Sequence, residues 1–178
     1  MLKRILAAAL LAVTCVAAPA FAKGDKLTAP ALTYAFTVTM KAGAPVELGE
    51  VDGVRRRFIP NLGGSVFGPK LRGEVLPGGG DWQSVLPGGV SKVDIRYFLK
   101  TTDGTIVEVT SPGIRVASAE VAERLARGED VDPMAYYYRV TPQLRINGGA
   151  QNWLGKTVFV AKGARRPDHV TFDFFAVE

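Results

Sequence analysis

The sequence has very few of the side chains that most often bind metals or act as nucleophiles, with one cysteine and one histidine in 178 residues. Cys15 lies in an N-terminal apolar segment that we expect to be cleaved off, so the mature chain would have no disulfide and no thiol nucleophile. The single histidine, His169, cannot form a His/Cys zinc cluster, and the acids are not grouped for a harder cation. No nucleophile-elbow motif accompanies it, which disfavours a hydrolase triad. The sequence therefore predicts no metal site.

Motifs that hold nucleotides or nucleic acids are also lacking. The glycine run Gly78–Gly80 does not stand between a strand and a helix, as a phosphate-binding loop or a dinucleotide fingerprint would require. The formal net charge is +5, and the basic residues are scattered except for Arg55–Arg57, a cluster more typical of a solvated strand edge than of a nucleic-acid interface. We therefore expect no cofactor and no nucleic-acid partner.

The N-terminus has the pattern of a secretory signal. Lys3 and Arg4 precede the apolar run Ile5–Ala18, which is too short to span a bilayer comfortably, and small residues lead to a cleavage position after Ala22. Cys15 is preceded by residues that fit a lipoprotein cleavage box poorly. The sequence predicts a signal peptide at 1–22 and a periplasmic or secreted location, and a lipid anchor on Cys15 is the less favoured alternative. Without the signal, 20 basic residues face 17 acidic ones, a formal charge of +3.

Alternation of apolar with small or polar residues dominates the rest of the chain. Residues Leu32–Met40 alternate without a break, which is typical of a strand with one buried face. Leu86–Gly89 and Asp103–Gly104 are tight-turn sequences between two such runs, and each predicts a β-hairpin. The expected strands are Leu32–Met40, Val54–Ile59, Ser65–Phe67, Lys70–Leu76, Trp82–Leu86, Val93–Thr101, Thr105–Thr110, Tyr136–Leu144, Thr157–Ala161 and His169–Val177.

One segment, Ser118–Arg127, predicts a helix, with Ser118 as its N-cap and Gly128 as its stop. The fold class is therefore all-β, a single antiparallel β-barrel of about 9–10 strands with one short inserted helix. A two-layer sandwich is the alternative; a barrel is favoured because its bent strands use glycines such as Gly64, Gly68 and Gly73. A flexible leader at 23–30 would precede one domain at 31–178.

Several separate segments carry a family resemblance. They are, in order, Gly64–Gly79, Asp81–Gln83, Asp94–Tyr97, Asp103–Gly104, Gly113–Arg115 and Tyr137–Pro142. Together they resemble the domain of unknown function 3237 (DUF3237) family, also called uncharacterised protein family UPF0311, over about residues 32–177. The resemblance implies a compact antiparallel β-barrel and no established general activity.

The chain also departs from this family. Where many relatives have an aromatic residue followed by Glu-Thr-Gly, it has Leu144–Asn147, and where they have Trp-Leu-Asn, it has Trp153–Gly155. Both changes remove polar groups. If the missing glutamate acts as an acid or base in active relatives, the resemblance implies that this chain lacks that role.

Asp81 is the candidate catalytic residue. It follows a glycine turn and stands beside Trp82 and Gln83, so we expect all three side chains to face a ligand. An apolar ring next to a carboxyl group can raise its pKa by excluding water, which suits a general acid or base. The alternative is structural: Asp81 would accept backbone N–H groups in the turn, and Trp82 would fill the core.

Further candidate ligand-binding residues come from other strands. Asp94 and Arg96 are two residues apart and therefore share a face of one strand. If that face lines the barrel, these side chains, together with Arg115, Tyr138 and Arg139, would hold an anionic or aromatic ligand. The alternative is an ion network on the outside of the barrel.

These patterns leave three functions open. The preferred one is an exported barrel that binds a small aromatic or anionic organic molecule, with possible acid–base chemistry of the isomerase or lyase type. The second is a non-catalytic structural or interaction barrel. The third is a small outer-membrane barrel, which the short strands and the charges of Lys70–Glu74 disfavour, so we expect no stable membrane insertion. The sequence makes no prediction of oligomeric state.

Overall fold

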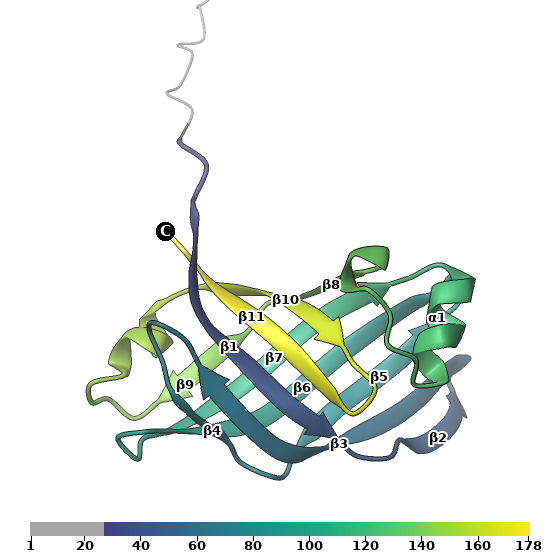
Figure 1. Ribbon diagram of the computed structural model, residues 1–178, viewed down its shortest axis with the longest axis horizontal. Helices are drawn as coiled ribbons and strands as arrows, with labels where there is room; N and C mark the ends of the chain where they lie inside the picture. The colour runs from purple at the N-terminus through teal and green to yellow at the C-terminus, as the bar shows by residue number, and fades with distance from the viewer. Residues whose placement is uncertain (1–26) are drawn as a thin grey trace, which may run out of the picture.

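The computed structural model describes residues 27–178, in which eleven β-strands form one sheet (Figure 1). The predicted signal peptide at 1–22 lies outside the described residues. The strands are β1 (Leu32–Ala42), β2 (Val46–Val51), β3 (Val54–Phe67), β4 (Gly73–Val75), β5 (Gly80–Leu86), β6 (Val90–Thr101), β7 (Ile106–Val116), β8 (Tyr137–Val140), β9 (Gln143–Ile146), β10 (Phe159–Arg165) and β11 (His169–Val177). The helices are α1 (Ala119–Ala126) and two 3₁₀ turns, η1 (Pro133–Ala135) and η2 (Asn152–Lys156).

The sheet closes into an antiparallel barrel, as predicted. Around the barrel the hydrogen-bonded order is β3, β1, β11, β10, β8, β7, β6, β5 and back to β3. The short strand β4 lies between β3 and β6, as β5 does, and the short strand β9 pairs with β7, as β8 does. Both short strands lie nearer the other end of the barrel. Strand β2 pairs only with β3, at the barrel edge. No helix among residues 27–178 is both long and apolar enough to cross a membrane.

Both predicted hairpins and the predicted helix are present. Leu86 pairs with Val90 across one turn, and Lys100 pairs with Ile106 across the other. Helix α1 begins after Ser118, whose hydroxyl accepts a hydrogen bond from the Val121 N–H at 3.3 Å. The local turn and capping sequences therefore determine these connections.

Three strand predictions need correction. The runs Val54–Ile59 and Ser65–Phe67 are predicted as separate strands, but they form the single strand β3. The run Tyr136–Leu144 was expected to be one strand, but it is divided at Thr141–Pro142 into β8 and β9, since proline cannot donate to a sheet ladder. Strand β2 was not expected, because all six of its residues are exposed and it has no buried face to give an alternating pattern. The sheet consequently has more strands than the 9–10 predicted.

Strand β1 does not keep the single face that its sequence suggests. Its pairing with β11 shifts between Tyr34 and Phe36, so Ala35 forms a bulge. Beyond the bulge Phe36, Val38 and Met40 are buried, whereas Tyr34 is exposed. The alternation over residues 32–40 is therefore broken once, and the N-terminal end of the strand turns away from the core.

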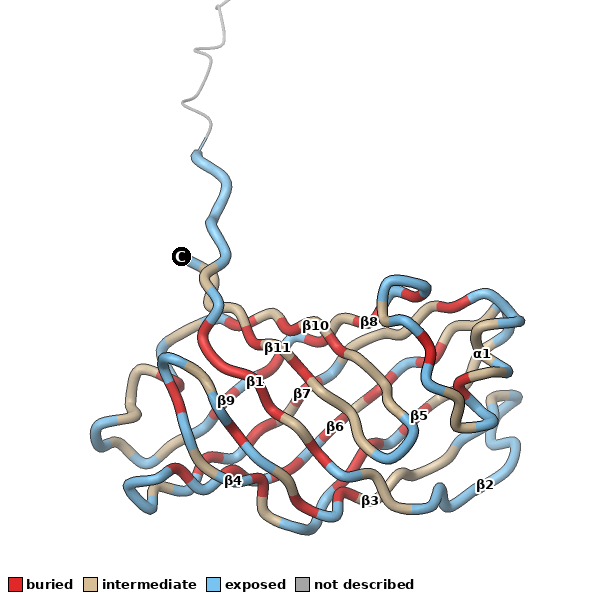
Figure 2. The backbone as a smooth tube through the Cα atoms, viewed as in Figure 1, coloured by how far each residue is buried: buried red, intermediate tan, exposed pale blue. Residues whose placement is uncertain are grey.

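The barrel interior is apolar at one end. Large side chains from strands and from η2 meet there and are fully buried: Phe36, Leu99, Val107, Leu154, Phe159 and Phe174. Phe36 and Phe174 stack with ring centroids 4.7 Å apart. Figure 2 shows buried positions alternating with intermediate or exposed ones along β6, as expected for a strand with one face inside the barrel. This end of the barrel is a packed core, and the space for a ligand lies at the other end.

Glycines allow neighbouring strands to approach closely at two positions of the sheet. A Cβ atom at Gly64 would lie 1.9 Å from the Thr39 carbonyl oxygen, and one at Gly73 would lie 2.3 Å from the Lys100 carbonyl oxygen. Real Cβ atoms cannot come so close to a neighbouring backbone. The glycines at these two positions therefore allow neighbouring strands to approach closely.

Candidate functional site

A cavity of about 310 Å³ opens at the end of the barrel opposite the aromatic core. Helix α1 lies at this end (Figure 1) and contributes Ala122, Glu123 and Leu125 to the lining. The barrel strands contribute both apolar and polar side chains. The apolar ones include Met40, Ile59, Val85, Ile95 and Val170, and the polar ones include Arg57, Asp81, Gln83, Ser91, Arg115, Tyr138 and Arg165.

Three arginines reach this cavity from three different walls: Arg57 from β3, Arg115 from β7 and Arg165 from β10. All three are partly buried. Within residues 27–178 none of the ion pairs includes their guanidinium groups. Burial lowers the pKa of Arg57 and that of Arg165, and the charge of Arg115 lowers both further. The cavity therefore holds a concentration of positive charge that the protein itself leaves largely unmatched.

Neutral groups orient these arginines. Arg115 donates from Nη2 to the Ser91 hydroxyl at 3.5 Å, and its guanidinium lies 5.9 Å from the Tyr138 ring centroid. Arg165 donates from Nη1 to the His169 carbonyl oxygen at 3.2 Å. Each contact uses only part of the donor capacity of a guanidinium, which has five N–H groups.

A hydrogen-bonded chain connects Arg57 to the carboxylate. Arg57 donates from Nε to Gln83 Oε1 at 2.8 Å, and Gln83 Nε2 donates to Asp81 Oδ2. Since a guanidinium can only donate, the Gln83 oxygen must face Arg57, and its NH₂ group must face Asp81. Asp81 Oδ2 is thereby always an acceptor. Asp81 Oδ1 is buried and has no hydrogen-bond partner among the described residues.

This environment makes Asp81 a titratable group near neutral pH. The residue is 9% exposed. Burial raises its pKa to about 6, although hydrogen bonds from Gln83 and from the backbone of Asp94, and the charges of Arg115 and Arg57, oppose the change. When Asp81 is protonated, the proton must lie on Oδ1, because Gln83 already donates to Oδ2. A carboxyl group with this pKa in the lining of a cavity can exchange a proton with a bound molecule.

Tyr138 supplies a neutral hydroxyl to the same lining. Burial raises the pKa of its phenol, and the nearby charge of Asp81 raises it further. The phenol therefore keeps its proton at neutral pH. With Ser91, it gives the cavity hydroxyl groups beside the charged ones.

The structure brings together four of the eight predicted site residues. Asp81, Gln83, Arg115 and Tyr138 all line the cavity. Trp82 does not: successive side chains of a strand point to opposite sides, so with Asp81 and Gln83 inside, Trp82 lies outside and is 47% exposed. The expectation that residues 81–83 all face one ligand is geometrically impossible on a regular strand.

The other three predicted residues also lie outside the cavity. Asp94 and Arg96 form an exposed ion pair at 2.7 Å, with the Arg96 guanidinium 5.9 Å from the Trp82 ring centroid. Arg139 stacks over the Tyr137 ring, 4.9 Å from its centroid. The inner face of β6 carries Val93, Ile95, Tyr97 and Leu99 instead. The alternative reading of an exterior ion pair is the one that the structure shows for Asp94 and Arg96.

Sequence reasoning missed Arg57, Ser91 and Arg165. The Arg55–Arg57 cluster was interpreted as a solvated edge, and Arg56 and the exposed pair of Arg55 with Glu47 fit that interpretation. Arg57, however, shares its side of β3 with Ile59, which also lines the cavity. Residues two apart on a strand face the same side, so the apolar Ile59 indicates that Arg57 faces the barrel interior.

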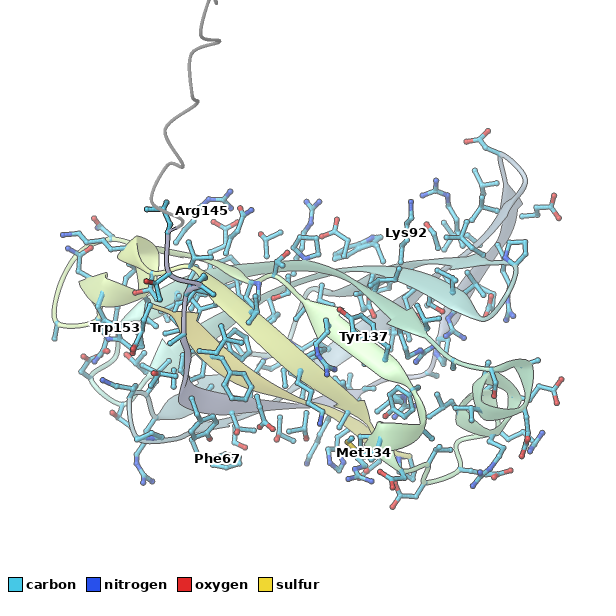
Figure 3. All side chains as sticks on the ribbon, turned by 90° about the horizontal axis from the view of Figure 1, so that it is seen from above. Phe67, Lys92, Met134, Tyr137, Arg145 and Trp153 are labelled. Atoms are coloured by element: carbon cyan, nitrogen blue, oxygen red, sulfur yellow. The ribbon has the colours of Figure 1, made fainter. Side chains whose placement is uncertain are left out.

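The segment that departs from the family lies away from the cavity. Leu144 is buried in the core, and the exposed side chain of Arg145 lies at the outer surface (Figure 3), where it pairs with Glu108 at 3.5 Å. None of residues 144–147 lines the cavity. The absence of a glutamate in this segment therefore does not remove an acid or base from the cavity.

Relatives of this chain have the same barrel. A UPF0311 protein of Rhodopseudomonas palustris is 38% identical over 144 residues, which are 81% of this chain and 94% of the relative. The crystal structure of a conserved protein of unknown function from the same species superposes with a TM-score of 0.82 at 36% identity, covering 85% of this chain and all of the other. A beta-barrel like protein from Acinetobacter baumannii gives a TM-score of 0.75 at 34% identity, covering 86% of this chain and 99% of that one.

A more distant structure shows the fold alone. The structure of an enzyme from Penicillium herquei gives a TM-score of 0.65 at 19% identity over 87% of this chain and 99% of that one. A family model described as a protein of unknown function (DUF3237) matches residues 30–177, nearly all of the described barrel. This match and the identity to the curated relatives show that the chain belongs to the DUF3237 family, whose curated members carry the name UPF0311.

Proposed function

We propose that the protein binds a small organic anion in its barrel cavity, where Asp81 exchanges a proton with the bound molecule. The observation that carries the proposal is that three partly buried arginines and one buried carboxyl group line the same cavity. Burying unmatched charge is unfavourable, and protein sites that do so commonly receive the opposite charge from a ligand. Arginine donors are suited to carboxylate or phenolate oxygens, to which they can donate in pairs.

The size and lining of the cavity limit the ligand to a small molecule. A volume of about 310 Å³ is at the lower end of known ligand pockets, and about half of it is enough to hold a benzene ring. Apolar side chains such as Ile59, Ile95 and Val170 line the space between the polar groups. An aromatic or similarly compact body with an acidic substituent fits both features.

Asp81 gives the site its chemistry. With a pKa of about 6, the carboxyl group is ionised in about nine molecules of ten at pH 7 and can still accept a proton readily. Asp81 lines the cavity, where its carboxyl group would take a proton from an acidic C–H or O–H group of the ligand. Such a transfer is the first step of isomerase and lyase reactions. The Penicillium herquei barrel, described as an enzyme, is consistent with catalysis in this fold but transfers no activity to this chain.

Benzoate and benzamide provide a matched pair of probes, because they have nearly the same shape and differ in charge. If benzoate binds with a dissociation constant of about 1 mM, 10 mM ligand stabilises the protein by about 1.4 kcal/mol and raises Tm by about 4 °C. We expect benzamide to leave Tm unchanged. Isothermal titration calorimetry on the same pair measures the affinity directly.

Two arginine variants make the binding test specific to the cavity. Arg115→Gln is expected to abolish the effect of benzoate, whereas Arg145→Gln, on the outer surface, keeps it. Equal shifts with benzoate and benzamide, or full benzoate binding by Arg115→Gln, would contradict the proposal. A barrel that responds to neither probe would favour the structural or interaction role.

Export is a separate part of the proposal. When the full-length chain is expressed in a Gram-negative host, we expect cleavage after Ala22 and release of the product by osmotic shock. Intact-mass measurement would then find a chain that begins at Lys23. Replacing Leu10 and Leu11 by arginine interrupts the apolar run and should keep the uncleaved chain in the cytoplasm. A wild-type protein of uncleaved mass in the spheroplast fraction would contradict export.

A further inference from the structure

The three cavity arginines surround the space instead of lying side by side. Going around the barrel, β7 with Arg115 is separated from β10 with Arg165 by β8, and from β3 with Arg57 by β6 and β5. Between β3 and β10 stand β1 and β11. The guanidinium groups therefore reach the cavity from three different parts of its wall.

Arg115 is the neighbour that the other two share. Its charge lowers the pKa of Arg57 and also that of Arg165. The repulsion thus acts across two gaps, one between Arg57 and Arg115 and one between Arg115 and Arg165. An anionic group in either gap would replace a repulsion by two attractions.

The charges of the cavity can be counted. Arg57, Arg115 and Arg165 carry three positive charges, and ionised Asp81 carries one negative charge, which leaves an excess of two. The lining also includes Lys41, Arg55 and Glu123, but these are exposed at the mouth. There Arg55 already pairs with Glu47 at 2.8 Å, and the charges of Lys41 and Glu123 are opposite. The unmatched charge therefore lies in the interior.

We propose that the ligand is a dianion, with one acidic group between Arg57 and Arg115 and a second between Arg115 and Arg165. This inference rests on the proposed function, since it specifies the ligand of the same cavity. Its chemical class is a compact dicarboxylate, or a carboxylate with a second ionised oxygen, on an apolar body. Asp81, connected to Arg57 through Gln83, would then lie beside the first acidic group.

Dicarboxylates and their monoesters test the number of charges without changing the protein. We would measure the affinity of the purified protein for benzoate, for the three benzenedicarboxylates, and for the monomethyl ester of each, at pH 8. The isomers place the two groups at different angles, so one of them should fit both gaps. For that isomer we expect the dianion to bind at least tenfold more tightly than its monoester and than benzoate.

Substitutions then assign the second group to its arginine. Arg165→Gln should reduce the affinity for the dianion to that for the monoester, while benzoate still binds through Arg57 and Arg115. Arg145→Gln, on the outer surface, should change neither affinity. If Arg165→Gln does not fold, Arg165→Lys keeps the charge but loses paired donation, and it should weaken dianion binding by a smaller factor.

The possible results separate this inference from the proposed function. If benzoate binds and no dicarboxylate binds more tightly than its monoester, the dianion inference is wrong and anion binding stands. The same conclusion follows if Arg165→Gln keeps the full preference for the dianion. If none of the carboxylates binds, the proposed function itself fails, and the inference fails with it.

Discussion

Replacing Asp81 by asparagine is expected to stabilise the protein at pH 8 and to leave its stability almost unchanged at pH 4. The folded protein raises the Asp81 pKa from 3.8 to about 6, mainly through burial. Between these two values the folded state holds the proton more strongly than the unfolded state does. Wild-type stability is therefore highest below the unfolded pKa and falls as the pH rises through the folded pKa.

The size of the effect follows from the pKa difference. A rise of about two pKa units corresponds to about 3 kcal/mol of destabilisation once the carboxyl group is ionised in both states. Asparagine has nearly the same shape, can still accept from Gln83, and has no charge to bury. Urea unfolding of both proteins at pH 4 and pH 8 would measure the difference.

An exterior acid is the control for this measurement. Asp94 belongs to an exposed ion pair with Arg96, and such pairs typically contribute less than about 1 kcal/mol. Asp94→Asn should therefore have a small effect at both pH values. If Asp81→Asn changed the unfolding free energy equally at pH 4 and pH 8, the buried ionised carboxylate would not be the cause.

The same result bears on why the carboxyl group is there. A residue that destabilises the folded protein at neutral pH contributes nothing to a purely structural barrel, in which asparagine would be the better choice. In a binding site the ionised form is useful, because it can receive a proton from a ligand. Stabilisation by Asp81→Asn together with loss of proton exchange would show the conflict between stability and activity that is common at functional sites.

The sequence predicted the barrel because its local signals agree. The turns at Leu86–Gly89 and Asp103–Gly104, the cap at Ser118 and the alternation along Val93–Thr101 each determine a neighbouring element, and all are present. The bulge at Ala35 could not be read from the sequence. It depends on how β1 pairs with a strand from the far end of the chain, which no local pattern records.

The site was harder to predict because alternation does not say which face of a strand is inside. On β6 the charged face with Asp94 and Arg96 is the outer one. On β3 the face with Arg57 is the inner one. A barrel with an apolar end and a polar end has both apolar and polar residues on its inner face. Near the cavity, the alternation of apolar and polar residues therefore does not identify which face of a strand is inside. Asp81 was found because its setting, a glycine turn before an aromatic residue, is local.

Gly64→Ala should destabilise the protein strongly, although it adds only one methyl group. The Cβ atom would lie 1.9 Å from the Thr39 carbonyl oxygen and 2.9 Å from its carbon. Both are backbone atoms, so no side chain can move aside, and β3 must shift away from β1. We expect a loss of about 3 kcal/mol in the free energy of unfolding, at the upper end of the usual range for overpacking.

The same shift should also reach the cavity, which distinguishes it from a purely local strain. Met40, the residue that pairs with Gly64, lines the cavity, and Arg57 lies farther along β3. Gly64→Ala should therefore weaken benzoate binding as well as stability. Gly155→Ala is the matched control: its nearest contact is a methyl carbon of Ile146 at 3.3 Å, which can give way, so we expect about 1 kcal/mol or less. Urea unfolding measures the loss of unfolding free energy in both variants. Equal losses would show that the close approach of β1 and β3 at Gly64 is not important for the stability of the barrel.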